Sequence, residues 1–378
     1  MWEIIPIFIT SCLLAFISHA GSTYDSLSKK YIKKERVLYA IMAICVIFFI
    51  GLRTRLNDTT NYLESYNRIP ENASLFYKVN FLKLGSNPGF WLLQNTMHRL
   101  GFSGQDFLLA FAFLSLGPIL WFVHKYSNNI FISVFLIFTA SIVTLNCGAI
   151  KQFTAMALGL IALDRMLNKK YCRFVLWLII ASTIHPYILM FALAPLLTFK
   201  PWGKKTYILL IIFVIAGIAM QILVNTILDV TTMLGEEYTE ESFTGAGVNP
   251  LRVVVALAPM ILSIFVARYG GYSEESKEQN LFINLTMLNG LIMFLALFGT
   301  ANYFGRLAHY FLPFVTLSVP YMLSCFRKEE KLLVGIFVIF GYLFFFWYGN
   351  VYGGVGAFDE YFDRINIFEY IKQILVEG

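Results

Sequence analysis

Apolar runs of about twenty residues recur along the whole chain, and charged residues are confined to short clusters between them. Such a run forms a helix that crosses a hydrocarbon core of about 30 Å at about 1.5 Å per residue. Charged residues make up only 14% of the 378 residues, whereas about a quarter is typical of a soluble domain. This pattern excludes a soluble enzyme, a β-sandwich, a DNA-binding module and a disordered tail. It predicts an all-α, polytopic integral membrane protein.

The apolar runs divide a single membrane domain, residues 1–378, into about ten transmembrane helices. The first run has no basic residues before it and no small-residue cleavage site, so we expect a retained span and not a signal peptide. The predicted spans are residues 2–20, 37–52, 106–124, 130–148, 150–167, 206–228, 251–268, 281–298, 304–325 and 332–349.

Basic clusters between the runs predict how the chain is oriented. Cytoplasmic loops are enriched in Lys and Arg. The first connection contains five such residues, Lys29, Lys30, Lys33, Lys34 and Arg36. The N-terminus is then outside, and Lys125 and the basic cluster at 169–173 also fall on the cytoplasmic side. Most of the net charge of +6 is explained by loops that fix orientation, so no nucleic-acid partner is expected.

Residues 172–197 form an apolar run that His185 and Pro186 interrupt. Proline lacks an N–H group and disfavours helix at the preceding residue, so a break is expected there. If this run crossed the membrane once, the basic clusters at 200–205 and 327–331 would lie outside. If it enters and returns as a broken, re-entrant pair, both clusters are cytoplasmic. We favour the re-entrant pair because one assumption accounts for two clusters, and the single crossing is the alternative.

Three longer segments then lie outside the cell. They are the loop at 53–105, the acidic loop at 229–250 and the C-terminal tail at 350–378. The cytoplasmic connections are short, and no connection is long enough to fold alone. Chemistry is therefore expected at the outer membrane–water boundary, or in a cavity that opens onto it.

Acidic residues gather in two of these external segments without the ordered spacing of a metal site. They are Glu236, Glu237, Glu240 and Glu241 in the acidic loop, and Asp359, Glu360 and Asp363 in the tail. Solvated charged loops are the favoured interpretation, and a bound cation is the alternative. No second histidine stands at a ligand spacing from His185, so zinc is not expected. The sequence predicts neither a metal nor another cofactor.

The densest polar cluster follows the second predicted span and contains Arg53, Arg55, Asp58 and Tyr62. Two arginines and a carboxylate within six residues suit a phosphate clamp beside a proton acceptor. The plainer alternative is an interfacial cluster in which Arg53 meets lipid headgroups and Asp58 caps a helix that begins at Thr59.

Two further candidates interrupt apolar surroundings. Lys151, followed by Gln152, starts a helix after an outer turn, and an ammonium there favours a bound anion or a carboxylate partner. The alternative for Lys151 is snorkelling to the interface. His185 lies at a helix break, where polar groups of membrane proteins tend to line cavities. Its alternative role is a single hydrogen bond to a neighbouring carbonyl.

The last candidate cluster stands at the outer start of the span at 304–325. Arg306, His309 and Tyr310 are spaced i, i+3 and i+4, so they share one helical face. Such a face is typical of a pocket wall, and the alternative is a capped helix end in the headgroup zone.

Taken in order, these clusters resemble the EpsG family, which belongs with the Wzy-type O-antigen and capsule polysaccharide polymerases. The resemblance extends from about Phe49 to Phe326. It rests on Gly51-Leu-Arg53 with Asp58 and Tyr62, Pro88-Gly-Phe-Trp, Lys151-Gln152 before a helix ending in Lys169-Lys170, Ala181-Ser-Thr-Ile-His185, and Gly305-Arg306 running into Tyr310-Phe311. The family often has Arg-Gln where this chain has Lys151-Gln152. A lysine keeps the charge and loses the bidentate fork, so the role of that position is open.

The resemblance implies glycosyl transfer on the outer face of a bacterial plasma (inner) membrane, on a site facing the periplasm or cell exterior. A growing glycan would move from its undecaprenyl diphosphate carrier to the terminal sugar of a lipid-linked repeat unit, as in O-antigen, capsule or exopolysaccharide synthesis. Donor and acceptor are then both lipid-linked oligosaccharides in the bilayer. A flippase and a chain-length regulator are implied partners.

The resemblance also suggests roles for the candidate residues. Arg53 and Arg306, helped by Lys151 or Arg55, would stabilise charge on the diphosphate leaving group. Asp58 or His185 would accept the proton of the attacking hydroxyl, with inversion at the anomeric carbon and without a metal. Catalytic roles are thus expected for Arg53, Asp58, His185 and Arg306. Substrate binding is expected for Arg55, Tyr62, Lys151, Gln152, His309 and Tyr310.

Two other functions fit the same sequence features. A glycosyltransferase that uses a polyprenyl monophosphate sugar would add one residue instead of a polymer. A flippase or transporter for the lipid-linked oligosaccharide would move its substrate without forming a bond, and would need charges along the whole path. Asp164 and Arg165 are the candidates for such charges near the inner end.

Overall fold

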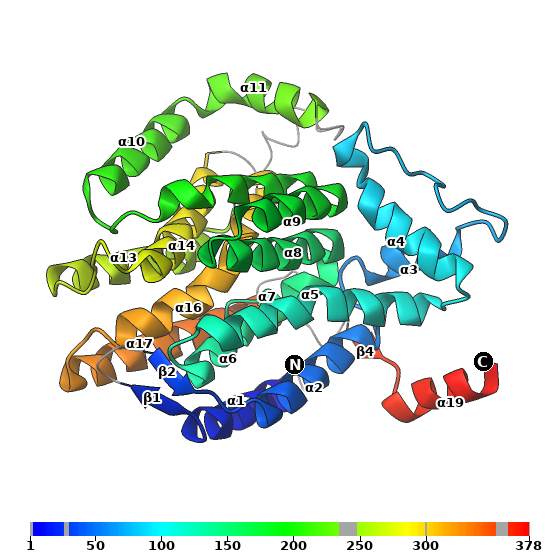
Figure 1. Ribbon diagram of the computed structural model, residues 1–378, viewed down its shortest axis with the longest axis horizontal. Coiled ribbons are helices and arrows are strands. Elements are labelled where there is room, and N and C mark those ends of the chain that lie inside the picture. Colours follow the sequence, from blue (N-terminus) through cyan, green and yellow to red (C-terminus); the bar gives the residue numbers. More distant parts are fainter. Residues whose placement is uncertain (1–2, 26–29, 234–247, 299–300, 353–361, 378) are drawn as a thin grey trace.

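The computed structural model describes residues 3–25, 30–233, 248–298, 301–352 and 362–377, and most of them are helical (Figure 1). The first half contains α1 (Ile4–Ala20), α2 (Val37–Gly51), α3 (Thr59–Asn67), the short η1 (Leu84–Ser86), α4 (Pro88–Arg99), α5 (Gly104–Tyr126), α6 (Ile130–Thr139), α7 (Ile142–Gly148) and α8 (Ile150–Leu167). The second half contains α9 (Tyr171–Ile184), η2 (Pro186–Leu197), α10 (Lys204–Ile218), α11 (Met220–Met233), α13 (Pro250–Arg268), α14 (Lys277–Leu295), η3 (Ala301–Gly305), α15 (Arg306–His309), α16 (Leu312–Leu323), α17 (Lys328–Trp347), η4 (Tyr348–Tyr352) and α19 (Ile367–Glu377).

Several helices are suited to a bilayer. Among the described residues, α5, α13 and the segment Lys328–Asn350 are long and apolar enough to span it. The pair α6 and α7, bent by 43°, passes as a fourth span when taken together. Shorter apolar helices are α1, α2, α9, η2 and α16. The predicted all-α membrane fold is confirmed, whereas the number of ten spans stays a prediction.

The helices form two packed groups (Figure 1). In the first group α1 packs on α2, α2 on α5, α5 on α8, and α8 on α9. In the second group α14 packs on α13 and α16, and α16 joins the first group through α6. Helix α14 is buried along nearly its whole length, so its polar side chains face protein and not lipid.

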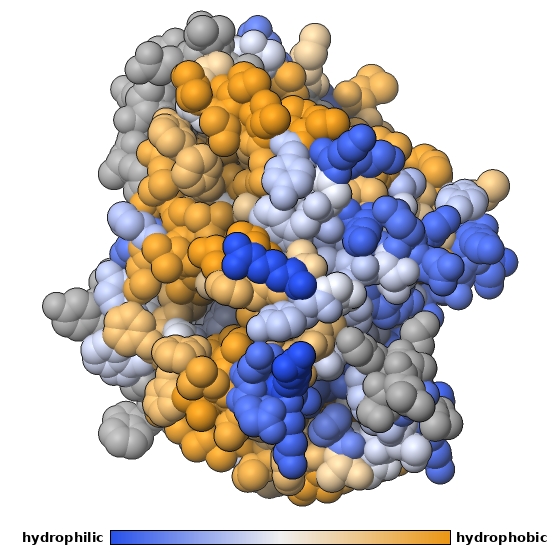
Figure 2. Space-filling model, turned by 90° about the vertical axis from the view of Figure 1, so that its left-hand side faces the viewer, coloured by the Kyte–Doolittle hydropathy of each residue, from blue (hydrophilic) through white to orange (hydrophobic). Residues whose placement is uncertain are grey.

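A pair of short strands lies at each end of the bundle. At the end that we call the hairpin end, β1 (Thr23–Asp25) pairs with β2 (Lys30–Lys33). At the opposite end, which we call the α3–α4 end, β3 (Arg53–Arg55) pairs with β4 (Asp363–Arg364). A segment near the C-terminus is thereby joined to the chain just after α2. Seen from the hairpin end, hydrophilic side chains gather on one part of the surface and apolar ones on another, and a hollow opens near the middle (Figure 2).

The apolar run at 172–197 is interrupted at His185. Helix α9 ends at Ile184, His185 is extended with φ −157° and ψ 117°, and η2 starts at Pro186. Segment η2 packs on α8, α9 and α14. Gly159 of α8 permits this approach, because a Cβ atom there would lie 2.5 Å from Ile188 Cδ1.

Asparagine side chains of α14 donate hydrogen bonds to backbone carbonyls near the ends of η2 and α15. Asn284 Nδ2 donates to the carbonyls of Leu197 and Phe199 at 2.7 and 2.8 Å. Asn289 Nδ2 donates to the carbonyl of Ala308 at 2.8 Å. A buried carbonyl without a donor is costly in an apolar environment, so these amides stabilise the ends of η2 and α15.

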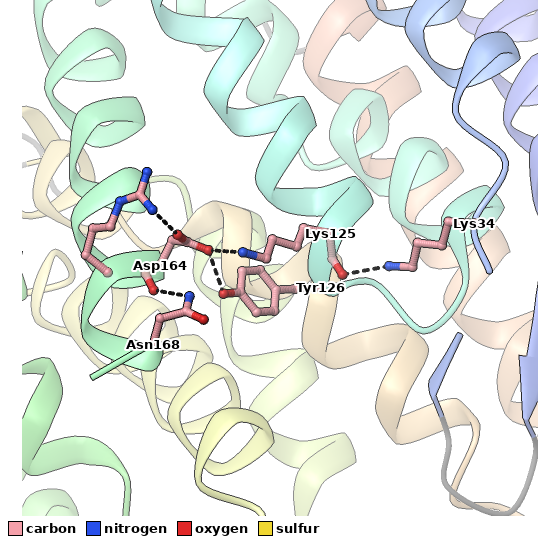
Figure 3. Close-up of polar contacts among 6 residues, drawn as sticks. Lys34, Lys125, Tyr126, Asp164 and Asn168 are labelled. Atoms are coloured by element: carbon pink, nitrogen blue, oxygen red, sulfur yellow. Dashed lines mark hydrogen bonds and ion pairs between the residues drawn. The ribbon is translucent and has the colours of Figure 1, made fainter. Parts of the chain in front are cut away.

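A polar network ties α5 to α8 near the hairpin end (Figure 3). The buried Asp164 carboxylate accepts hydrogen bonds from Lys125 Nζ and from Tyr126 Oη, the latter at 2.9 Å. Arg165 lies 3.6 Å from its other oxygen. Lys34 Nζ in turn donates to the carbonyls of Lys125 and Ser127 at the end of α5. The network joins the ends of α5 and α8 to the segment before α2.

Substituting Asp164→Ala is expected to destabilise the protein by roughly 2 kcal/mol, because Lys125 and Tyr126 lose a charged acceptor. Thermal unfolding of the purified protein in detergent should show a melting temperature lowered by several degrees. Glu274→Ala removes an exposed carboxylate and is the matched control, with no expected change. An unchanged melting temperature for Asp164→Ala would contradict the stabilising role of the network.

Candidate functional site

A cavity of about 530 Å³ lies in the bundle toward the α3–α4 end. Its walls come from the turn before α3, the α6–α7 break, the start of α13, the segment from α15 to α16, and the ends of α14 and α17. Among the described residues, the acidic and basic side chains that line it are those of Asp58, Arg252, Arg306 and His309. They come from three regions that are far apart in the sequence.

Asp58 reaches this cavity because the chain turns sharply after β3. Asn57 is left-handed, with φ 48°, a conformation that asparagine tolerates better than most residues. Asp58 stands at the N-cap position of α3, but its side chain makes no capping hydrogen bond. Among the described residues its carboxylate has no hydrogen-bond or ion-pair partner, and it is exposed to the cavity.

Arg53 lies behind the cavity wall and is fully buried. Its guanidinium donates to Thr59 Oγ1 at 2.9 Å, to the Ile50 carbonyl at 2.8 Å and to the Cys147 carbonyl at 3.4 Å. These bonds tie the end of α2 and the start of α3 to α7. Arg53 therefore holds the turn that carries Asp58, and it is not among the residues that line the cavity.

Arg306 and His309 project from α15, whose backbone is held from two sides. Gln152 of α8 donates to the Arg306 carbonyl, and Asn289 of α14 donates to the Ala308 carbonyl. The Arg306 guanidinium is exposed, and within the described chain it has no hydrogen-bond or ion-pair partner. This leaves its donors available to a ligand.

Arg252 is the third residue of α13 and lines the same cavity. A cation at a helix start meets the positive end of the helix dipole, so its position is unfavourable unless an anion is near. Both Arg252 and Arg306 interact electrostatically with His309. Both guanidinium groups line the cavity together with His309, and neither has an ion-pair partner in the part of the chain that is described.

A second set of predicted residues, His185, Tyr310 and Lys151, lies outside the cavity lining. His185 Nδ1 and Tyr310 Oη are 2.7 Å apart, and both Lys151 and Arg306 interact electrostatically with His185. The Lys151 ammonium lies 5.0 Å from the centre of the Phe90 ring. Of these residues only Arg306 lines the cavity.

Tyr62 of α3 connects the two sets. It interacts electrostatically with Asp58, Arg306 and Arg53. Burial raises the pKa of Tyr62 to about 12, and the Asp58 carboxylate acts in the same direction. Its phenol is therefore neutral near pH 7 and is available as a hydrogen-bond donor. Arg55, by contrast, is exposed in β3 opposite Asp363 and is not part of the cavity lining.

The sequence that forms this cavity matches a known protein family. A family model described as the EpsG family matches residues 36–362. The chain belongs to the EpsG family. The match includes every ionisable residue of the cavity, and the family comprises Wzy-like polysaccharide polymerase-type proteins. No curated protein and no solved structure matches the chain.

The predicted resemblance to the EpsG family is thus confirmed, and the chain is a polysaccharide polymerase-type membrane protein. Of the predicted site residues, Asp58, Arg306 and His309 meet in the cavity of this EpsG-family protein. Arg252 was not predicted. Its signal in the sequence was an arginine just after Asn249-Pro250, at the start of a helix and at the end expected to lack basic residues.

Two predicted regions fall partly on residues that are not described. They are residues 234–247 of the acidic loop and 353–361 of the tail, which include the two acidic clusters apart from Asp363. Among the described residues, no three His, Cys, Asp or Glu side chains are grouped so that they could hold a metal ion.

Proposed function

We propose that this EpsG-family protein elongates a polysaccharide by transferring a growing glycan from undecaprenyl diphosphate to the terminal sugar of a lipid-linked repeat unit. The observation that carries the proposal is the pair Arg252 and Arg306, two guanidinium groups without protein partners among the described residues, facing one cavity beside the Asp58 carboxylate. A diphosphate is the ligand that two such groups suit, because guanidinium binds phosphate oxygens in a bidentate manner.

The proposed transfer forms one bond and breaks another at the anomeric carbon. The acceptor hydroxyl oxygen attacks this carbon while Asp58 takes its proton. The bond from the anomeric carbon to the diphosphate oxygen breaks, and the electron pair leaves with undecaprenyl diphosphate. Arg252 and Arg306 stabilise the negative charge on that leaving group, so the step as proposed includes no metal ion. Direct attack inverts the anomeric configuration.

The geometry changes the roles that we propose for two predicted residues. Arg53 uses its donors within the protein, so we assign it the positioning of Asp58 instead of contact with the diphosphate. His185 is hydrogen-bonded to Tyr310, so Asp58 becomes the preferred base and His185 the alternative. Lys151 and Tyr62 remain candidates for substrate binding around Arg306.

The proposal places the α3–α4 end on the outer side of a bacterial plasma membrane. The hairpin end carries Lys125 and Lys169, which the positive-inside rule places in the cytoplasm. A flippase would then have to supply the lipid-linked repeat unit, and a chain-length regulator is a further proposed partner.

Transfer from a polyprenyl monophosphate sugar is the second enzymatic candidate, and two guanidinium groups favour a diphosphate over it. The transporter alternative needs charges that remain available along the membrane. Asp164 and Arg165, the candidates for such charges, belong to the polar network of Lys125 and Tyr126. This use of Asp164 argues against a transport path through that end.

Incubation of the purified protein with synthetic undecaprenyl-diphosphate-linked repeat units tests the proposal. A ladder of products on a gel, each longer by one repeat, is the expected result. Addition of a single sugar from a monophosphate carrier would support the second candidate. Translocation across proteoliposomes without any new bond would support the transporter.

A further inference from the structure

The cavity is lined by both polar and apolar side chains, and we call the part lined by Val255 and Ala256 of α13 and by Tyr342 and Phe345 of α17 its apolar half. On α13, Arg252 is followed one turn deeper by Val255 and Ala256, which share its face of the helix. On α17, Phe345 and Tyr342 line the cavity below Tyr348, which stands at the start of η4. Both walls therefore change from polar to apolar with depth in the bundle.

The apolar half is separated from the outside of the bundle by one layer of helix. The opposite side of α17 is exposed, with Phe340 67% and Phe344 52% accessible, and Val254 of α13 is 61% accessible. In a membrane protein these side chains face lipid. A hydrocarbon chain in the apolar half would thus lie next to the bilayer from which it came.

One hydrogen bond joins α13 to the end of α17 at the polar end of this space. Asn249 Nδ2 donates to Tyr348 Oη at 3.0 Å, while Asn249 Oδ1 accepts from the Leu251 amide at the start of α13. The contact is exposed. It is the type of contact that can open and close without rearranging the packed core of the bundle.

We propose that the apolar half holds the first isoprenoid units of the diphosphate carrier, which enters sideways between α13 and α17 past the Asn249–Tyr348 hydrogen bond. This inference rests on the proposed function, because it assigns the lipid tail of the same substrate. A carrier bound in this way has its diphosphate within the part of the cavity that Arg252 and Arg306 line, since Arg252 lies one turn before Val255 on α13 and Arg306 lines the same cavity. The cavity thus accommodates both parts of an amphiphilic molecule.

A matched pair of substitutions on neighbouring residues tests the proposal. Val255→Trp fills the apolar half, whereas Val254→Trp places the same side chain toward lipid. Each variant is assayed with one repeat unit on two carriers, undecaprenyl diphosphate as the long carrier and methyl diphosphate as a short carrier that has no isoprenoid unit. For Val255→Trp, kcat/KM should fall roughly tenfold or more with the long carrier, because displacing two methylene groups from an apolar surface costs about that factor. It should stay within about twofold of the wild type with the short carrier.

Val254→Trp should behave as the wild type with both carriers. An equal loss for both carriers in Val255→Trp, or no loss, would overturn the proposal. A melting temperature close to that of the wild type shows that Val255→Trp has folded.

A second measurement does not require transfer. Undecaprenyl diphosphate without sugar, carrying a photoreactive group near the diphosphate, should label peptides of α13 and α17 in the wild-type protein. Labelling of other helices alone would overturn the proposed tail site. Specific labelling of α13 and α17 by a protein that forms no polymer would support the tail site while contradicting the proposed function.

Discussion

Replacing Arg306 by alanine is expected to lower the rate of polymer formation by roughly 10³-fold. Arg306 interacts electrostatically with His309, His185 and Tyr62, so its charge acts on both sets of polar residues. Its loss leaves Arg252 as the one guanidinium among the described residues that line the cavity. The rate is measured from the ladder of products that the purified protein makes from a lipid-linked repeat unit.

The control for this substitution is Arg268→Ala, which removes an exposed arginine from the far end of α13. It should leave the rate and the melting temperature unchanged. Arg306→Lys should recover only part of the activity, because lysine keeps the charge and loses the bidentate geometry. Polymer formation at close to the normal rate by Arg306→Ala would remove Arg306 from the mechanism.

Substituting Asp58→Asn is expected to lower kcat by roughly 10²–10⁴-fold with little change in KM. The amide has nearly the same shape as the carboxylate but cannot accept the proton of the attacking hydroxyl. Asp58 makes no side-chain capping bond to α3, so the folded structure should not depend on its charge. Initial rates at several acceptor concentrations separate kcat from KM.

Glu64→Gln is the matched control for Asp58→Asn. Glu64 is an exposed carboxylate of α3 that pairs with Arg68 and is not part of the cavity lining. Its amide variant should keep normal rates. Near-normal turnover by Asp58→Asn would transfer the role of base to His185, and His185→Gln should then show the large loss of kcat.

Local sequence patterns were sufficient to predict the membrane fold, the break at His185 and three of the residues that meet in the cavity. Apolar run length specifies a helix for the bilayer, and proline restricts the residue before it, so both features are encoded within a few positions. Asp58, Arg306 and His309 stood out because charged and polar side chains are rare in such a chain. Such residues can also be recognised from the local sequence alone.

Some residues were missed or given a different role, and the roles of these residues depend on contacts between segments that are distant in the sequence. Arg53 has the local sequence of a headgroup-binding residue, and only the approach of α7 gives it the Cys147 carbonyl as a partner. Arg252 becomes a cavity residue because α13 and α15 both pack on α14. The asparagines of α14 are polar residues in a central helix, and their partners lie as far as 87 positions away in sequence. Hydrophobic periodicity carries no information about such pairings.

The pairing of β3 with β4 has a practical consequence for handling this protein. Arg53–Arg55 leads directly into the turn that carries Asp58, and its strand partner is Asp363–Arg364. The Ile365 amide also donates to the Leu52 carbonyl at 2.9 Å, and Phe362 stacks on Phe49. A truncation before residue 362 therefore removes the strand partner of the segment that leads to Asp58, although the two are three hundred residues apart in the sequence.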